Sequence, residues 1–288
     1  MDILFFAHLL NGLLMIAMPV GLAIFLTARW KLSARLWLIG AATFILSQVG
    51  HIPFNALAGL VLNRTGLTKM TPEAQLIFNA VFLGLSAGLF EEFFRYGMFR
   101  WWAKEARSWR KGVLAGAGHG GAEAIILGAI VLYAFVQLVY LRNADISKVV
   151  PAGQLALTQQ QVSAYWSMTW YASLLGALER LFTIPTQIAL AVLVLQTFTR
   201  KQWFWVWLAV LYHAVLDGSS VVLATRLGTL PTEGLVGGFA VLSVILIFLL
   251  RQPELSEETL PPSAPPPSVF APKPPEATPE KLDQTRFA

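Results

Sequence analysis

Ionisable side chains recur within long apolar stretches of this 288-residue sequence, at spacings that would allow them to act together. Three pairs are four residues apart: Glu91 and Arg95, His119 and Glu123, and His213 and Asp217. Residues four positions apart lie on one face of an α-helix, so each pair would present both side chains to the same neighbour. Carboxylates and imidazoles placed in this way are the groups that general acid–base catalysis uses most.

This set of residue types is sufficient for peptide hydrolysis. A carboxylate beside a neutral imidazole can take a proton from water and return it to the leaving amine. A second imidazole can stabilise the negative charge that develops on the carbonyl oxygen. The sequence contains no cysteine, which excludes a thiolate nucleophile and cysteine-bound metals. A hydrolase that activates water through Glu91, His119 and His213 is therefore the first hypothesis.

The same residues could instead hold a metal ion. His119, His213 and Glu91 form a two-histidine, one-carboxylate set of the kind that binds catalytic zinc and leaves a position open for water. The metalloprotease string H-E-x-x-H is absent from the sequence. Zinc is therefore the alternative cofactor, whereas water activation by glutamate and histidine requires none.

A serine nucleophile is disfavoured. The run from Gly84 to Gly88 matches the G-x-S-x-G pattern of serine hydrolases, with Ser86 at its centre. That pattern works at a sharp turn between a strand and a helix. Here it lies inside a continuous apolar stretch that is typical of a helix.

The composition indicates which elements must position these residues. Hydrophobic residues make up 56% of the sequence and charged residues only 13%, whereas soluble domains contain about 25% charged residues. Many apolar runs reach the length of about 18 residues that a helix needs to cross a bilayer. A soluble globular fold is excluded, and an all-α, polytopic transmembrane helix bundle is predicted.

Apolar runs and polar breaks predict about seven spans, near residues 3–27, 35–62, 73–102, 112–141, 164–199, 203–225 and 234–250. Residues 1–250 would form this helical domain, and the external loop at 142–163 could contain an interfacial helix. From residue 251 the sequence becomes rich in proline. Residues 251–288 are predicted to form a disordered cytoplasmic tail, for which the sequence identifies no partner.

The distribution of basic residues predicts the orientation. The loops after the first, third and fifth spans hold most of the positive charge: Arg29, Lys31, Arg35, Arg100, Lys104, Arg107, Arg110, Lys111, Arg200 and Lys201. The positive-inside rule therefore places the N-terminus outside and the C-terminus inside. Because these residues are spread over short loops and form no single patch, a nucleic-acid partner is not expected.

The spans would bring the chemical groups to a common depth. Glu91, His119 and His213 lie about 7–10 residues from the cytoplasmic ends of their helices, or roughly 10–15 Å into the membrane. Charges at this depth are costly, so we expect them to pair with one another around a hydrated cavity. Nearby glycines would let the helices approach closely. A polar stripe that could border this cavity consists of Gln48, His51 and Asn55.

Four segments together resemble a known family: EEFFRY (91–96), GAGHGGAEAI (116–125), ER (179–180) and HAVLDG (213–218). They resemble the bacterial YhfC family of intramembrane peptidases. That family is related more remotely to the CAAX-protease and bacteriocin-processing (CPBP) membrane endopeptidases. The resemblance covers the four spans from 73 to 225, and the combination of segments is more specific than any one of them.

The resemblance implies a role for each matching residue. Four would be catalytic: Glu91 as general base, Glu92 as its partner, His119 to assist water activation and His213 to stabilise the oxyanion. Arg95 would order the acidic pair. The other supporting residues would be Glu123, Glu179, Arg180 and Asp217. Alternatively, Glu123 and Asp217 could each orient the histidine four residues before it. Glu179 and Arg180, which as chain neighbours need not share a helix face, could make a structural ion pair to another helix.

Two positions depart from the expected pattern. The remote family has three residues between the acidic pair and the arginine, but here there are only two, Phe93 and Phe94. This difference places Arg95 differently on its helix. Gln187 stands where a YhfC-like histidine would be expected, and this substitution could mean a weakened or lost activity.

Three functions are compatible with these patterns. The leading hypothesis is an intramembrane endopeptidase that cuts a membrane-associated protein or peptide near the cytoplasmic side of a membrane, most simply a bacterial plasma membrane. A proton-coupled transporter would also use buried acidic, basic and imidazole groups, although the sequence shows no internal repeat. A non-catalytic scaffold descended from a peptidase is the third. Besides the substrate, the predicted partner is the lipid bilayer.

Overall fold

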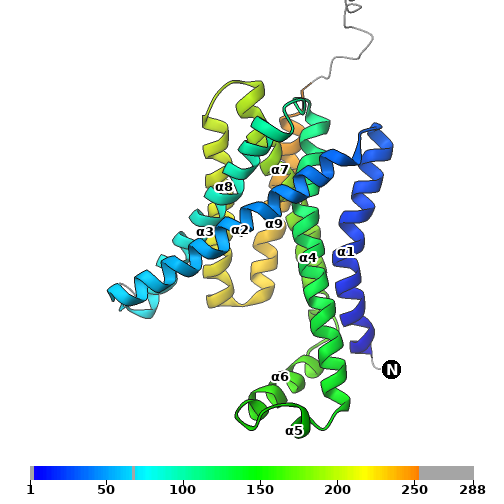
Figure 1. The fold of residues 1–288 in the computed structure, drawn as a ribbon, viewed down its shortest axis with the longest axis vertical. Helices are drawn as coiled ribbons and strands as arrows, with labels where there is room; N and C mark the ends of the chain where they lie inside the picture. The colour runs from blue at the N-terminus through cyan, green and yellow to red at the C-terminus, as the bar shows by residue number, and fades with distance from the viewer. Residues whose placement is uncertain (1–2, 67–68, 253–288) are drawn as a thin grey trace, which may run out of the picture. The chain divides into compact units, whose positions relative to one another are not determined.

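The computed structural model describes residues 3–66 and 69–252, and the regular secondary structure in these ranges is entirely helical. Its long helices are α1 (Ile3–Trp30), α2 (Ala34–Thr65), α3 (Pro72–Gly97), α4 (Trp109–Asn143), α7 (Leu175–Thr199), α8 (Phe204–Leu227) and α9 (Thr229–Leu249). The shorter elements are η1 (Met98–Trp102), α5 (Ile146–Val149), η2 (Ala152–Gln154), α6 (Leu155–Ser167) and η3 (Ala172–Leu174). The predicted all-α class is confirmed (Figure 1).

The chain is an integral membrane protein. Within the described residues, seven helical segments are long and apolar enough to cross a membrane, as predicted. They comprise the seven long helices, with η1 continuing α3 to Trp102 and η3 extending α7 back to Ala172. The predicted proline-rich tail lies outside the described residues from residue 253 onward, so the division at residue 251 stays a prediction.

The predicted fifth span, 164–199, begins too early. Helix α6 ends at Ser167, where Met168 adopts an extended backbone, and the next transmembrane segment begins at Ala172. In Figure 1, α5 and α6 lie beyond the bundle at the end of α4. Aromatic residues such as Trp170 count as apolar in the sequence but favour the membrane interface, so the apolar run extended past the true boundary.

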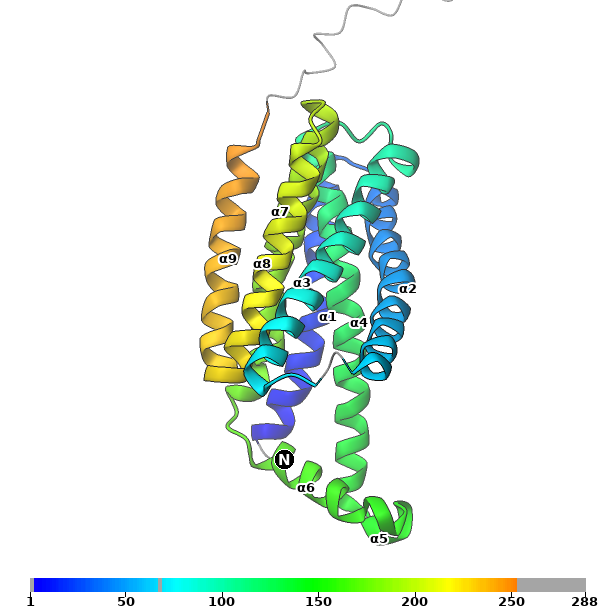
Figure 2. The same cartoon turned by 90° about the vertical axis from the view of Figure 1, so that its left-hand side faces the viewer.

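The connections that carry the predicted cytoplasmic charge lie at one end of the bundle. Figure 2 shows the α1–α2, η1–α4 and α7–α8 connections together at the top. Which face of the membrane this end occupies stays a prediction. Arg107 belongs to one of these connections but turns toward the bundle, where it donates to the carbonyl oxygen of Phe99 at 2.8 Å and lies over the ring of Phe198.

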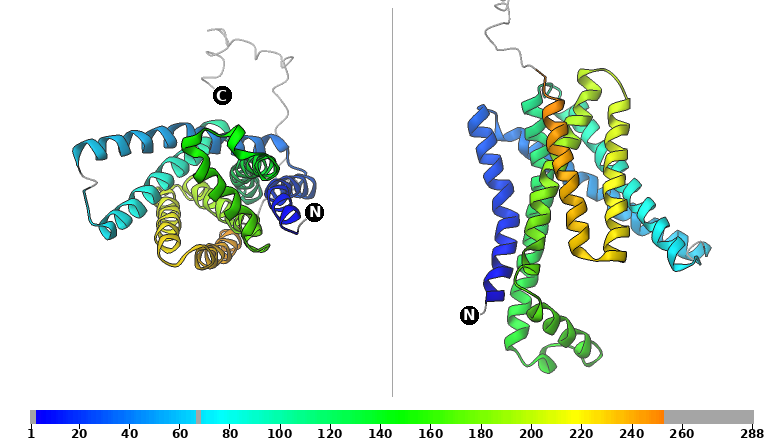
Figure 3. Two further views of the ribbon diagram at one scale, coloured as in Figure 1. Left: turned by 90° about the horizontal axis from the view of Figure 1, so that it is seen from below. Right: turned by 180° about the vertical axis from the view of Figure 1, so that it is seen from behind.

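Helix α7 is the central element of the bundle. It contacts α1, α3, α4, α8 and α9, and Figure 3 shows it enclosed by other helices when seen along the bundle. Residues 189–195 are buried all round the helix, as expected for an apolar helix covered on every side. The polar side chains of α7, including Arg180 and Gln187, must therefore find their partners inside the protein.

Helices α3 and α8 run side by side (Figure 2) because small residues line their contact. A Cβ atom on Gly88 would lie 2.7 Å from the carbonyl oxygen of Val210, which is closer than side chains normally approach. Only glycine permits this approach. Gly88 and Val210 each lie three residues before a predicted site residue, Glu91 and His213, so the packing brings these two side chains to the same level.

The same principle applies between α2 and α4, and it can be tested. A Cβ atom on Gly118 would overlap the backbone of Trp37. We expect Gly118→Ala to force the two helices apart and to lower the free energy of unfolding by about 1–3 kcal/mol. Thermal unfolding of the detergent-purified protein measures this change.

Gly59→Ala is the matched control for this prediction. Gly59 lies on α2, and a Cβ atom there would have no neighbour within 4 Å. Because alanine also has the higher helix propensity, this change should leave the melting temperature equal or slightly raised. Equal melting temperatures for the two variants would contradict the close-packing argument.

Candidate active site

Helix α3 carries a buried charge cluster of Glu91, Glu92 and Arg95. The side chains of Glu92 and Arg95 are completely buried, and Glu91 is only 6% exposed. Arg95 donates to Glu92, three residues earlier, and its second terminal nitrogen lies 3.5 Å from Glu91 Oε2. The helical spacing makes both contacts possible. The guanidinium thus offsets part of the cost of burying two carboxylates.

Glu91 connects α3 to α4 and α2. Its Oε2 atom lies 3.0 Å from His119 Nε2, and its Oε1 atom accepts a hydrogen bond of 3.0 Å from Gln48 Nε2. His119 is buried, packs edge-on against the ring of Phe44 and has no hydrogen-bond partner for Nδ1 among the described residues. A carboxylate and an imidazole from different helices are therefore in direct contact, with Gln48 of the predicted polar stripe bonded to the same carboxylate.

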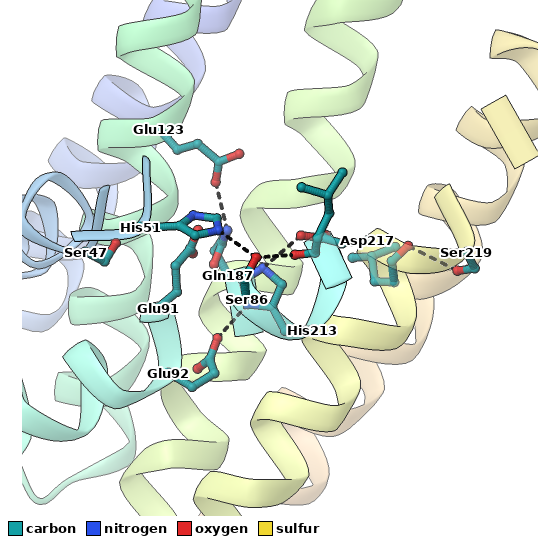
Figure 4. A network of polar contacts seen from close by, with 12 residues as sticks. Ser47, His51, Ser86, Glu91, Glu92, Glu123, Gln187, His213, Asp217 and Ser219 are labelled. Atoms are coloured by element: carbon teal, nitrogen blue, oxygen red, sulfur yellow. Dashed lines mark hydrogen bonds and ion pairs between the residues drawn. The ribbon is translucent and has the colours of Figure 1, made fainter. Parts of the chain in front are cut away.

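Glu92 connects α3 to α8. Its Oε1 atom lies 2.8 Å from His213 Nδ1, and the opposite ring nitrogen of His213 lies 3.5 Å from Asp217. Figure 4 shows Glu92 and His213 turned toward each other, with Asp217 one turn further along α8. A carboxylate on Nδ1 fixes the orientation of the ring and leaves Nε2 directed to Asp217.

Gln187 joins this cluster to a second one. Its side-chain oxygen accepts from Arg95, and its amide nitrogen donates to Glu123 Oε2 at 2.8 Å (Figure 4). Glu123 in turn accepts from Arg180 at 2.6 Å, and Arg180 also bonds Glu179. The amide is suited to this position because it presents an acceptor to a cation and a donor to a carboxylate.

The structure thus places every predicted site residue in one connected set, which keeps two of the three pairs predicted from spacing and gives Glu123 other partners. Glu123 lies four residues after His119, yet its hydrogen bonds in the described structure go to Gln187 and Arg180. Arg180 forms an ion pair with Glu123 on α4, as the alternative of an ion pair to another helix proposed, and it also pairs with its chain neighbour Glu179. His213 lies 3.5 Å from Asp217, four residues later, which is farther than its 2.8 Å contact with Glu92.

Ser86 lies close to this set but inside helix α3. Its hydroxyl donates to the carbonyl oxygen of Leu83 at 3.1 Å and lies 3.1 Å from His51 Nε2. The same ring nitrogen lies 2.9 Å from the amide nitrogen of Asn55. The hydroxyl lies within a continuous helix, and no strand-to-helix turn exposes its oxygen.

Sequence reasoning missed one buried acid. Glu233 is 7% exposed on α9, and its Oε2 atom has no hydrogen-bond partner within the described residues. The predicted seventh span began at residue 234, whereas α9 begins at Thr229. A span started one turn earlier would have included this acid among the intramembrane charges.

Two hollows reach the site from different directions. The first, which we call the polar cavity, has a volume of about 440 Å³ and lies between α7, α8 and α9. The second, which we call the apolar groove, has a volume of about 770 Å³ and lies between α2 and α4, with Val49, Ile52 and Ile130 exposed along it. Glu91 and Glu123 line both hollows.

Comparison with known proteins identifies relatives over most of the chain. A model of the YhfC intramembrane metalloprotease family matches residues 14–240. The uncharacterized membrane protein YhfC of Bacillus subtilis (strain 168) is 29% identical over 228 residues, which cover 74% of this chain and 82% of the relative. No solved structure matches the chain.

The matching description names a metalloprotease, but the donor set does not fit a zinc ion. Catalytic zinc usually has three protein ligands, and in the described part of the chain no three histidine or acidic side chains are arranged to hold a metal. Arg95 contacts both Glu91 and Glu92, and a guanidinium in this position repels a divalent cation. His119 Nδ1 and Glu92 Oε2 have no hydrogen-bond partner among the described residues, but two such atoms are too few to bind a zinc ion.

This charge arrangement predicts the metal content. We expect the detergent-purified protein to contain no stoichiometric zinc, because Arg95 already supplies the positive charge between the two glutamates. Elemental analysis of the wild type beside His119→Ala and His213→Ala measures it. About one zinc per chain in the wild type, lost in both variants, would contradict the prediction.

The burial of Arg95 predicts a large effect on stability. Arg95→Met leaves two buried carboxylates without their cation, which should cost about 3–5 kcal/mol. Arg226 provides the matched control because its ion pair with Glu73 is exposed, and Arg226→Met should cost about 0–1 kcal/mol. Thermal unfolding and size-exclusion chromatography report both changes. Similar melting temperatures for the two variants would contradict the conclusion that Arg95 stabilises the buried cluster.

Proposed function

The chain belongs to the YhfC intramembrane metalloprotease family, and from that premise we propose that it hydrolyses peptide bonds of membrane-associated substrates. In this proposal Glu91 and His119 activate the attacking water. Glu92 and Arg95 hold the catalytic groups in place. The substrate is a membrane protein or peptide with an apolar segment.

The meeting of the two hollows at Glu91 is the observation that supports this function. Hydrolysis inside a membrane requires water and an apolar chain to reach the same carboxylate. The polar cavity is lined by hydroxyl and carboxylate groups that can hydrate it, such as Thr183 and Ser220. The apolar groove is lined by aliphatic side chains such as Ile45 and Leu127 on the flank of the bundle. Glu91 lies at the border of both environments.

The contacts of Glu91 suit a general base. Water that enters from the polar cavity can donate a proton to Glu91, while Gln48 and His119 hold the carboxylate in a fixed orientation. The oxygen of that water then attacks the peptide carbonyl, and the proton passes from Glu91 to the leaving nitrogen. A glutamate in this role needs no covalent intermediate.

His213 is placed to stabilise the negative charge of the tetrahedral intermediate. Glu92 holds its Nδ1 atom, and Nε2 lies 3.5 Å from Asp217, which lines the polar cavity together with His213. A protonated ring can donate Nε2–H to the developing oxyanion. Donors fixed in advance in this way lower the energy of the transition state more than donors in water do.

Replacement of Glu91 tests the proposal. Glu91→Gln keeps the shape of the side chain but cannot accept the proton, so we expect cleavage to fall by a factor of about 10²–10⁴. The measurement compares new N-termini of membrane proteins, identified by mass spectrometry, in bacterial membranes that contain wild-type or variant protein.

Glu105→Gln is the matched control, because Glu105 is an exposed acid in the η1–α4 connection. This variant should produce the same new N-termini as the wild type. Cleavage products that persist in Glu91→Gln, while the protein remains folded, would refute a base role for Glu91. A complete absence of protein-dependent N-termini in the wild type would refute the peptidase proposal itself.

A further inference from the structure

The polar cavity carries a strong excess of negative charge. Among the described residues its lining includes five carboxylates, from Glu91, Glu123, Glu179, Asp217 and Glu233, against the guanidinium of Arg180 and the imidazole of His213. Arg180 is already bonded to Glu123 and Glu179. The cavity follows one face of α8 from the level of His213 to Ala224 and reaches Thr229 at the start of α9. It therefore continues well beyond the groups that the proposed hydrolysis uses.

Among these carboxylates, Glu233 is the buried one with an oxygen that has no hydrogen-bond partner in the described residues. The residue is buried in the wall of the cavity, and the oxygen without a partner is Oε2. Burial of a carboxylate without a donor is costly. An acid held in this way, next to a cavity, can be completed by a ligand that brings hydrogen-bond donors and positive charge.

The cavity walls also suit the stem of a basic side chain. Aliphatic groups from Leu216, Val221 and Val236 lie between the acids. Lysine and arginine pack their methylene stems along apolar surface and extend the charge beyond it. The volume of about 440 Å³ lies within the range of small-ligand pockets, about 300–1,000 Å³.

We propose that the polar cavity is a specificity subsite for a basic residue of the substrate, with Glu233 and Glu179 as the groups that bind its cation. This proposal rests on the proposed peptidase function and adds a substrate class. The preferred substrate has an apolar segment, which lies in the apolar groove, followed by a lysine or arginine close to the bond at Glu91. Arg180 keeps Glu179 directed into the cavity through their ion pair.

Peptide binding tests this subsite without requiring cleavage. The probes are fluorescent peptides with one apolar transmembrane segment of leucine and alanine, followed either by lysine or by the uncharged analogue norleucine. Binding is measured to the full-length protein in lipid nanodiscs. We expect the lysine peptide to bind about 10-fold more tightly or better, as for a charge-assisted hydrogen bond.

Variants of the two acids assign the effect to the cavity. Glu233→Gln should reduce the preference for lysine to about twofold or less, without changing the affinity for the norleucine peptide, and Glu179→Gln should reduce it in part. Glu73→Gln is the matched control, because Glu73 is an exposed acid at the start of α3. This variant should keep the full preference. If Glu233→Gln does not fold, Glu179→Gln, at a partly exposed position, still tests the subsite.

Each remaining outcome has a defined meaning. Equal affinity for the two peptides in the wild type would overturn the subsite. The same peptides are also compared with a free and with an acetylated N-terminus. Tighter binding that depends on the free N-terminus, and not on lysine, would overturn the assignment of the subsite to a basic side chain. Lysine-dependent binding without cleavage would support the subsite and count against the peptidase proposal, whereas cleavage without lysine preference would do the reverse.

Discussion

The buried guanidinium of Arg95 is the interaction on which the rest of the structure depends. It lies between the two glutamates of its own helix and reaches Gln187 on α7. Gln187 continues to Glu123 on α4, and the second glutamate continues to His213 on α8. A cation at this depth is tolerated only where acceptors and negative charge surround it. The contacts that begin at this single charge link four helices at one level.

The spacing of residues in the sequence predicted much of this convergence. Acid and imidazole groups within apolar runs have to meet, because a membrane offers them no other partners. That constraint was sufficient to place Glu91, His119 and His213 in one site, and it needed no knowledge of helix packing. The family resemblance rested on the same residues, and membership is now supported over residues 14–240.

The pairing of groups was not predictable, because it depends on how each helix is rotated against its neighbours. Glu123 shares a helix face with His119, but close packing of α4 on α7 directs its carboxylate to Gln187. Gln187 was noted only as a departure from a pattern, yet it is the residue that joins two charge clusters. Glu233 was missed because hydropathy places helix ends poorly, and one turn decides whether an acid counts as buried.

Among the helices that carry the site, the glycine contacts make two closely packed groups, α3 with α8, and α4 with α2 and α7. Glu91 belongs to the first group, whereas His119 and Gln48 both belong to the second. The distance between Glu91 and His119 therefore depends on how the two groups of helices are placed relative to each other. Tilting of helices is the usual response to a bilayer that is too thin or too thick. A tilt of one group of helices against the other would change the separation between Glu91 and His119 without any change in either side chain.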